Sequence, residues 1–209
     1  MTDLYLIRHG QSKANMTPVV GGMQGDAGLT DVGREQARLL EERLRAERFR
    51  ADALYTSTLP RARQTADFVA RALDLPAVGD DGLQELRPGE ADGLSLTDWR
   101  AAYPPVRFGP HEDAFEPFSP GGESWATFLA RTGAVLSHLI TRHEGERVVA
   151  VTHGGVVEAS FSLALGLGAT AVRVTFAPAN TGITHWHQHT ATGDRAWTLV
   201  GFNDASHLG

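Results

Sequence analysis

The stretch Leu4-Tyr5-Leu6-Ile7-Arg8-His9-Gly10, close to the first residue, decides how the fold of this chain can be interpreted. Its first four residues are largely apolar, so they suit a central strand that helices cover on both faces. The strand then runs into a cation, an imidazole and a glycine. In open α/β sheets the ligand site lies beyond the carboxyl ends of the strands. Arg8 and His9 are therefore predicted to lie in a functional site.

Two later stretches repeat this arrangement. Residues 53–55 and 148–151 are short apolar runs, and each precedes a polar cluster, Thr56-Ser57-Thr58 or Thr152-His153-Gly154. Segments with helical spacing of apolar residues separate the runs, which is typical of βα units. The sequence therefore predicts an α/β fold, a three-layer αβα sandwich with a mostly parallel central sheet. The three polar clusters should meet at one edge of that sheet.

Several helix boundaries can also be predicted. Pro60 suits the first turn of a helix that runs to about residue 73, and further helices are expected over about 125–140 and 155–165. Thr30 is a suitable N-cap for a helix over about 31–48. The residues of that helix expected to face the core are Val32, Ala37, Leu40 and Leu44.

The composition is that of a soluble globular protein, with 42% hydrophobic and 21% charged residues. A length of 209 residues suits a single domain over 1–209. The formal net charge of -6 disfavours nucleic acid or anionic lipid as the main partner. Cysteine is absent, which excludes disulfides, thiolate ligands and cysteine nucleophiles. Without a signal peptide or a long apolar run, a cytoplasmic protein with no membrane contact is expected, and a homodimer stays open.

Residues 104–120 contain five of the ten prolines and three phenylalanines, Phe108, Phe115 and Phe118. This density of proline excludes a regular helix or a central strand. The segment is predicted to be a long excursion that is packed by its aromatic side chains and lies near the mouth of the site.

Six blocks of sequence, in order, resemble the histidine phosphatase superfamily and its phosphoglycerate mutase-like group. The blocks are residues 8–15, 28–37, 56–66, 83–93, 121–131 and 151–155. Two blocks depart from the usual pattern, because Gly28 stands where a proline is common and the proline of the third block is displaced. The resemblance is strong over about residues 4–160 and loose beyond them. It implies a phosphoglycerate mutase-like fold and phosphoryl transfer without a metal or other cofactor.

The resemblance also implies a role for particular residues. His9 would attack phosphorus and carry the phosphoryl group, and a neutral imidazole whose other nitrogen donates to a fixed acceptor suits that step. Arg8 and Arg61 would balance the charge on the phosphoryl oxygens, because a guanidinium binds them in pairs and stays protonated. Glu85 would protonate the leaving group, and His153 would donate to a phosphoryl oxygen.

Further candidates for phosphate or substrate binding are Asn15, Gln24 and Gly154. Asn15 could add a neutral donor, and Gly154 could let the phosphate approach the amino end of a helix. Should Glu85 not be the acid, Glu123 or Glu90 is the next candidate.

Each main candidate has a simpler explanation when it is taken alone. Arg61 could be half of a surface ion pair, Glu85 a solvated loop carboxylate, and His153 a hydrogen-bonded core residue. The joint placement of Arg8, His9, Arg61 and His153 just after or near three strand ends favours the functional interpretation.

Residues 185–189, His-Trp-His-Gln-His, would place three imidazoles on one face of a strand. His185, His187 and His189 could then hold a metal ion, or they could be the polar residues of an exposed strand face. The second interpretation is preferred because the pattern includes no carboxylate or cysteine.

The sequence thus predicts a phosphomonoester hydrolase that acts on a small phosphorylated metabolite through a phosphohistidine. A cofactor-dependent phosphoglycerate mutase would use the same residues, but it needs a longer substrate-closing segment than the one that follows Glu85. A non-catalytic member that binds phosphorylated ligands is a third alternative, and the acid Glu85 counts against it. The identity of the substrate does not follow from the fold.

Overall fold

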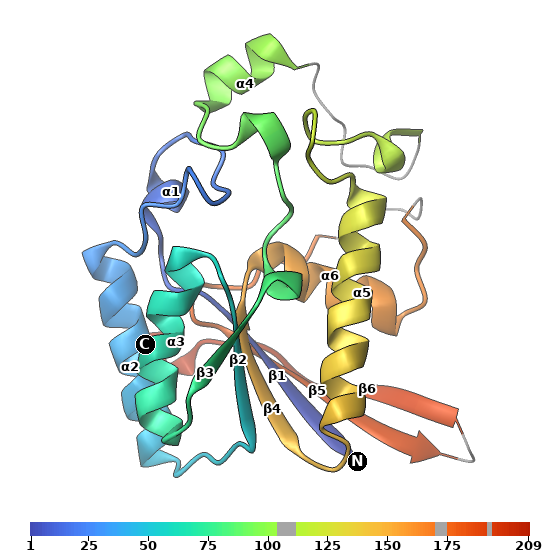
Figure 1. Cartoon of the computed structure of the whole chain (residues 1–209). Helices are drawn as coiled ribbons and strands as arrows, with labels where there is room; N and C mark the ends of the chain where they lie inside the picture. The colour runs from blue at the N-terminus through green and yellow to red at the C-terminus, as the bar shows by residue number, and fades with distance from the viewer. Residues whose placement is uncertain (104–111, 170–174, 192–193) are drawn as a thin grey trace.

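A six-stranded sheet forms the centre of the computed structural model, which describes residues 1–103, 112–169, 175–191 and 194–209. The strand order is β3-β2-β4-β1-β5-β6 (Figure 1). The strands are β1 (Thr2–Arg8), β2 (Ala53–Ser57), β3 (Ala77–Asp80), β4 (Arg147–Thr152), β5 (Ile183–Ala191) and β6 (Asp194–Asp204). The first four of these strands are parallel, and β5 pairs antiparallel with both β1 and β6. The predicted mostly parallel sheet is confirmed.

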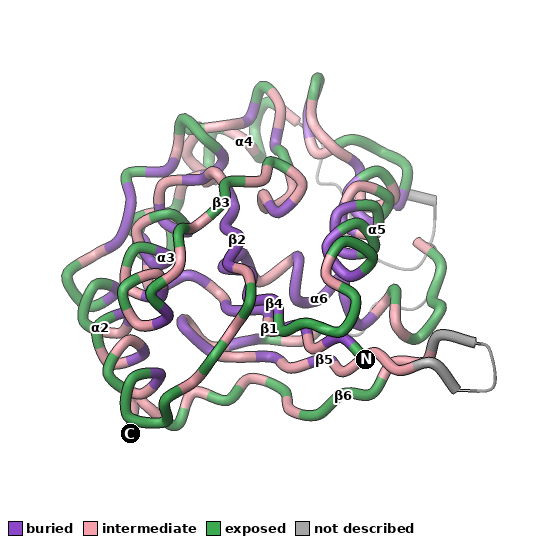
Figure 2. The backbone as a smooth tube through the Cα atoms, turned by 60° about the horizontal axis from the view of Figure 1, so that its bottom comes forward, coloured by how far each residue is buried: buried purple, intermediate pink, exposed green. Residues whose placement is uncertain are grey.

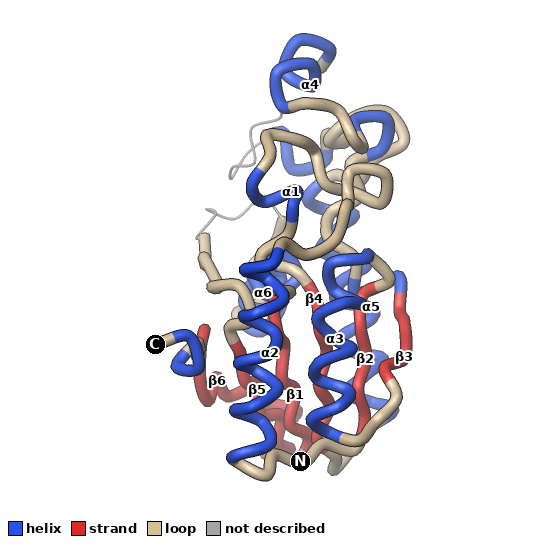
Figure 3. Tube along the Cα trace, turned by 90° about the vertical axis from the view of Figure 1, so that its left-hand side faces the viewer, coloured by secondary structure: helices blue, strands red, loops and turns tan. Residues whose placement is uncertain are grey.

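Helices cover the sheet on both faces. The helices of the described chain are α1 (Lys13–Met16), α2 (Asp31–Ala46), α3 (Pro60–Leu73), α4 (Leu96–Ala102), α5 (Trp125–Arg142) and α6 (Gly154–Ala164). Of these, α1 and α4 lie beyond the carboxyl edge of the sheet (Figure 1) and do not cover its faces. Helices α2 and α3 lie side by side against one face (Figure 3), and α5 and α6 pack on the other. Figure 2 shows the central strands buried between these layers. Burial on both faces explains why the strands have apolar residues at successive positions.

The strand β1 shows how its side chains divide between the layers. Leu4 and Leu6 belong to the core under α5 and α6, whereas Ile7 belongs to the core under α2 and α3. The register pairs Arg8 with Thr152 of β4, and Thr56 of β2 lies opposite Val151. The carboxyl ends of β1, β4 and β2 are therefore level, and the loops that follow them meet at one edge of the sheet.

The predicted start of α2 is confirmed by the N-cap bond from the Gly33 N–H to the Thr30 hydroxyl. The expectation that Val32 faces the core is wrong, because its side chain is 55% exposed. The buried stripe of the helix begins one residue later, at Gly33, and a shift of one residue turns a side chain by about 100°. The helix also ends at Ala46, slightly before the expected boundary.

Part of the proline-rich segment is described. Residues Glu112–Phe115 form a short 3-10 helix, and the ring of Phe118 stacks on Trp99 of α4 at 4.6 Å. Phe115 is exposed, so the expected packing by aromatic residues holds for Phe118 and not for Phe115. Phe108 lies outside the described residues. Across the described ranges, no helix is long and apolar enough to cross a membrane.

Candidate active site

The polar clusters after β1, β2 and β4 meet at the carboxyl edge of the sheet, as predicted from the sequence. The backbone N–H of His9 donates to the Thr152 carbonyl at 2.9 Å, and the rings of His9 and His153 lie 5.1 Å apart. The exposed fractions of His9 and His153 are 3% and 0%. Both imidazoles are therefore withdrawn from bulk water into one buried polar site.

The hydrogen bonds of His9 define its tautomer. Its Nδ1 lies 2.7 Å from the Gly10 carbonyl, which can only accept, so Nδ1 carries the proton. Its Nε2 accepts a hydrogen bond from Arg61 Nε at 3.1 Å, so the lone pair is on Nε2. Burial lowers the pKa of His9 well below its ordinary value, and the positive charges of Arg61 and Arg8 lower it further, against a smaller opposing effect of the Gly10 carbonyl. The ring is therefore neutral, with its lone pair on Nε2.

Two side chains hydrogen-bond the backbone of the turn formed by His9 and Gly10. The Gly10 N–H donates to the Thr65 hydroxyl at 3.0 Å, and the His9 carbonyl accepts from Asn180 Nδ2 at 2.8 Å. A Cβ atom on Gly10 would lie 2.5 Å from the Gly33 carbonyl oxygen of α2, closer than the neighbouring backbone allows. Glycine at this position lets the turn that follows β1 pass close to α2.

Arg61, in the first turn of α3, is buried and paired with Asp26. Its Nη1 donates to Asp26 Oδ2 and to the Gly21 carbonyl, each at 3.0 Å, and its backbone N–H donates to the same carboxylate at 3.1 Å. The Asp26 side chain is fully buried, and its other oxygen accepts from the Gly28 N–H at 2.9 Å. The ion pair of Arg61 and Asp26 is therefore buried, and the simpler explanation of Arg61 as half of a surface ion pair does not hold. Asp26, which no sequence motif indicated, holds this guanidinium beside His9.

His153 and Arg8 each have a buried nitrogen that no group of the described chain hydrogen-bonds. Ser57 Oγ accepts from the Leu59 N–H at 3.3 Å and lies 2.8 Å from His153 Nε2, so the hydroxyl proton can be donated to Nε2. The proton of the neutral ring then lies on Nδ1. Burial, followed by the charge of Arg61, lowers the pKa of His153 well below its ordinary value. Among the described residues, neither His153 Nδ1 nor Arg8 Nε has a hydrogen-bond partner, although both atoms are buried.

The carboxylate of Glu85 lies at the amino end of α6. Its Oε2 accepts from the Gly155 N–H at 3.0 Å, and its Oε1 accepts from the Leu86 N–H at 3.1 Å. A Cβ atom on Gly155 would lie 2.1 Å from Oε1, whereas one on Gly154 would have Arg8 Nε at 3.6 Å as its nearest neighbour. The close contact of the Glu85 carboxylate with α6 therefore requires a glycine at position 155. Gly154 lies beside Arg8, and its expected role in letting phosphate approach stays a prediction.

A cavity of about 350 Å³ opens beside Glu85. Its lining is mostly apolar and includes Gly21, whose carbonyl holds Arg61. The described lining residues are Val20, Gly21, Glu85, Leu86, Pro88, Leu96, Phe118, Trp125, Phe128, Gly155 and Glu158. Phe118 brings the end of the proline-rich segment to this cavity, which agrees with its expected place at the mouth of the site.

Two weaker candidates lie in the loops around the site. The side-chain oxygen Oδ1 of Asn15 accepts from the Ser12 N–H at 3.0 Å and closes a capping box of α1. Gln24 is exposed, and its backbone N–H donates to Asp92 Oδ2 at 2.9 Å. No hydrogen bond within the described ranges joins either side chain to His9 or Arg61, so their binding roles stay predictions.

The alternative acids are placed differently from Glu85. Both oxygens of Glu123 accept from Arg131 at 2.6 Å. Burial alone would raise the pKa of Glu123, but the hydrogen bonds from Arg131 and from the Arg87 N–H hold it below its ordinary value. Glu90 is exposed and accepts from the Tyr103 hydroxyl at 3.3 Å. Neither carboxylate lines the cavity beside Glu85.

The three histidines of β5 lie away from this site. His185 Nε2 and His187 Nδ1 lie 2.7 and 2.9 Å from Asp3 Oδ1, and His189 stacks on His187. Asp3 is a carboxylate that the local sequence pattern did not include. Even so, no group of three or more His, Asp or Glu side chains in the described part of the chain is arranged to hold a metal ion.

The sequence and the structure were both compared with those of known proteins. Residues 4–205 match the histidine phosphatase superfamily (branch 1). The chain is 32% identical to a metal-independent phosphoserine phosphatase of Arabidopsis thaliana, over 100% of this chain and 84% of the relative. It is 34% identical to a 2,3-bisphosphoglycerate-dependent phosphoglycerate mutase of Methylobacterium sp. (strain 4-46), over 78% of this chain and 81% of the relative.

The crystal structure of a phosphoserine phosphatase mutant from Entamoeba histolytica, in complex with phosphoserine, has a TM-score of 0.80 and 27% identity over 100% of both chains. The chain belongs to the histidine phosphatase superfamily. Within it, the protein is a phosphomonoester hydrolase.

Proposed function

We propose that His9 Nε2 is the nucleophile of a metal-independent, two-step hydrolysis of small phosphomonoesters. The supporting observation is the polar set around this nitrogen. A neutral imidazole presents its lone pair beside Arg61. Two buried nitrogens, Arg8 Nε and His153 Nδ1, have no hydrogen-bond partner in the described part of the chain and are available to donate to phosphoryl oxygens. Preorganised donors of this kind stabilise the charge that develops during phosphoryl transfer.

In the first step, the Nε2 lone pair forms the N–P bond while the bond from phosphorus to the leaving oxygen breaks. Arg61 Nε, which donates to Nε2 in the free protein, must move aside and then faces the phosphoryl oxygens. Glu85, as the neutral acid, gives its proton to the leaving oxygen. In the second step, the Glu85 carboxylate takes a proton from water, the water oxygen attacks phosphorus, and the N–P bond breaks to release phosphate.

The cavity beside Glu85 is the proposed site for the leaving group. The Arabidopsis relative acts on phosphoserine by its description, and the Entamoeba structure contains phosphoserine. A small phosphorylated metabolite is therefore the proposed substrate class. The single sheet, with strands from both ends of the chain, supports a single-domain enzyme.

The mutase activity is less favoured. Only Leu86-Arg87-Pro88 separates Glu85 from the 3-10 helix Gly89–Ala91, and this leaves no room for an added closing segment at that point. A panel of phosphorylated metabolites, assayed for released phosphate with and without a chelator, tests the proposal. Phosphate release that survives chelation and is lost in His9→Ala supports it. Interconversion of phosphoglycerates without release would favour the mutase, and no turnover of any ester would favour a binding protein.

A further inference from the structure

The ion pair of Glu123 and Arg131 lies next to the segment that carries Glu85, and the proposed reaction has so far given it no role. Arg131 Nε and Nη2 donate to the two oxygens of Glu123, each at 2.6 Å, in a bidentate arrangement. Both side chains are largely buried. Bidentate pairs between arginine and a carboxylate fix the relative orientation of their partners as well as their separation.

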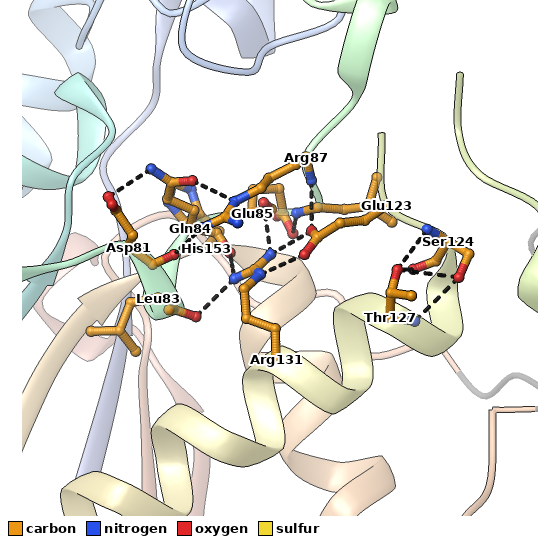
Figure 4. A network of polar contacts seen from close by, with 12 residues as sticks. Asp81, Leu83, Gln84, Glu85, Arg87, Glu123, Ser124, Thr127, Arg131 and His153 are labelled. Atoms are coloured by element: carbon orange, nitrogen blue, oxygen red, sulfur yellow. Dashed lines mark hydrogen bonds and ion pairs between the residues drawn. The ribbon is translucent and has the colours of Figure 1, made fainter. Parts of the chain in front are cut away.

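The remaining N–H groups of Arg131 bind the backbone around Glu85. Nη1 donates to the carbonyls of Gly82 and Gln84 at 2.8 and 2.9 Å, and Nη2 donates to the Glu85 carbonyl at 3.2 Å. Every N–H of the guanidinium is therefore used. Figure 4 shows Arg131 between Glu123 and the backbone of this segment.

Glu123 holds the same segment from its other end. Its Oε2 accepts from the Arg87 N–H at 2.9 Å, and its own N–H donates to the Arg87 carbonyl at 2.8 Å. Residues 82–87 are thus bound on both sides of Glu85 by one ion pair. The pair is anchored to α5, since Arg131 lies within that helix and Ser124 closes its capping box with Thr127.

The Glu85 carboxylate depends on this backbone for its position. Its hydrogen bonds in the described chain come from two backbone N–H groups, those of Leu86 and Gly155. A movement of residues 82–87 relative to α6 would break one of these bonds and shift the carboxyl oxygens from the leaving group. A displacement of about 1 Å in a reacting group can lower the rate by roughly 10²-fold.

We propose that Arg131, held by Glu123, is a positioning residue that sets the Glu85 carboxyl in place for proton transfer to the leaving group. This proposal rests on the role of Glu85 in the proposed function. Arg131 touches no reacting atom, so its loss should affect the step that needs the Glu85 proton and leave the phosphate-binding groups unchanged.

The test compares two esters in kcat/KM, which reports the steps up to departure of the first product. An alkyl phosphate from the panel needs a proton on its leaving oxygen, whereas 4-nitrophenyl phosphate releases a phenolate that does not. Arg131→Lys keeps the charge but cannot make the bidentate bonds. It should lower kcat/KM for the alkyl ester by about 10- to 100-fold and for the aryl ester by less than about 3-fold.

Arg131→Lys in a Glu85→Gln protein should lower kcat/KM for the alkyl ester little further, because the carboxyl group that Arg131 positions is already lost. Arg71→Lys is the matched control, since Arg71 makes a similar pair with Glu41 at the surface, and it should leave both rates unchanged. Glu123→Gln is a milder second variant should Arg131→Lys fold poorly, and it should show the same selective loss.

The positioning role would be overturned if Arg131→Lys lowered kcat/KM equally for both esters. It would also be overturned if Arg131→Lys lowered kcat/KM for the alkyl ester as much in the Glu85→Gln protein as in the original protein. If Glu85→Gln is selective for the alkyl ester and the Arg131 and Glu123 variants are not, the inference alone fails. If Glu85→Gln itself slows both esters equally, the acid role of Glu85 fails, and the positioning role fails with it.

Discussion

The pairing of Asp26 with Arg61 yields a prediction that can be quantified from the structure. In Asp26→Asn, an amide replaces a carboxylate that accepts from Arg61 Nη1, from the Arg61 N–H and from the Gly28 N–H. If the amide oxygen faces Arg61, its NH₂ group meets the Gly28 N–H, so one donor is left without an acceptor. The Arg61 charge also stays buried without its counter-ion.

Removing one partner of a buried ion pair costs about 3–5 kcal/mol of folding free energy. With a urea dependence of about 1–3 kcal/mol per M, the unfolding midpoint of Asp26→Asn should fall by at least about 1 M. The control is Glu35→Gln, which breaks a pair with Arg38 whose side chains are both exposed, and its midpoint should match that of the original protein.

Replacing both partners separates the loss of charge pairing from other effects. Asp26→Asn with Arg61→Met should be more stable than Asp26→Asn alone, because no unpaired charge remains. A midpoint for Asp26→Asn equal to that of the Glu35→Gln control would refute the reasoning. It would show that the pairing of Asp26 with Arg61 contributes little to the folding free energy.

Three further predictions concern the site. Folding lowers the pKa values of His9 and His153, so the stability that they contribute is present above the unfolded pKa of about 6.5 and is lost as the pH falls below it. The urea midpoint should therefore be lower at pH 5.5 than at pH 7.5. This difference should be smaller in His153→Asn. Gly155→Ala should slow alkyl ester hydrolysis much more than Gly154→Ala, because only the first Cβ would meet the Glu85 carboxylate, and equal effects would contradict this. When turnover of a phosphate-labelled ester is quenched without acid, the labelled phosphate should be found on His9 as an acid-labile adduct. Absence of labelled phosphate on His9 would indicate direct attack by water.

The strand ends were predictable because a parallel sheet brings them together in a fixed way. An apolar run that stops at Arg8-His9 or before His153 shows both its place in the sheet and the edge on which its polar residues lie. Arg61 was identified through the resemblance, and its burial only from the structure.

The supporting residues could not be predicted in the same way. Asp26 lies in a loop and reaches Arg61 across 35 positions, and Asn180 reaches His9 across 171. No periodicity connects such residues, because loop conformations determine their contacts. The acidic residue two positions before Gly28 was a usable signal, since aspartate often accepts from the N–H two residues on. Val32 failed for a simpler reason, because an apolar residue in the first turn need not share the buried stripe.

The central position of β1 affects the order in which the protein can assemble during synthesis. This strand precedes the other strands of the sheet in the chain, yet its two neighbours, β4 and β5, come from residues 147–152 and 183–191. Until most of the chain has left the ribosome, the strand that leads into His9 has unpaired edges and apolar side chains on both faces. Nascent chains that stop before residue 183 should therefore expose an edge of β1, bind chaperones and aggregate readily, even though every proposed catalytic residue is already present.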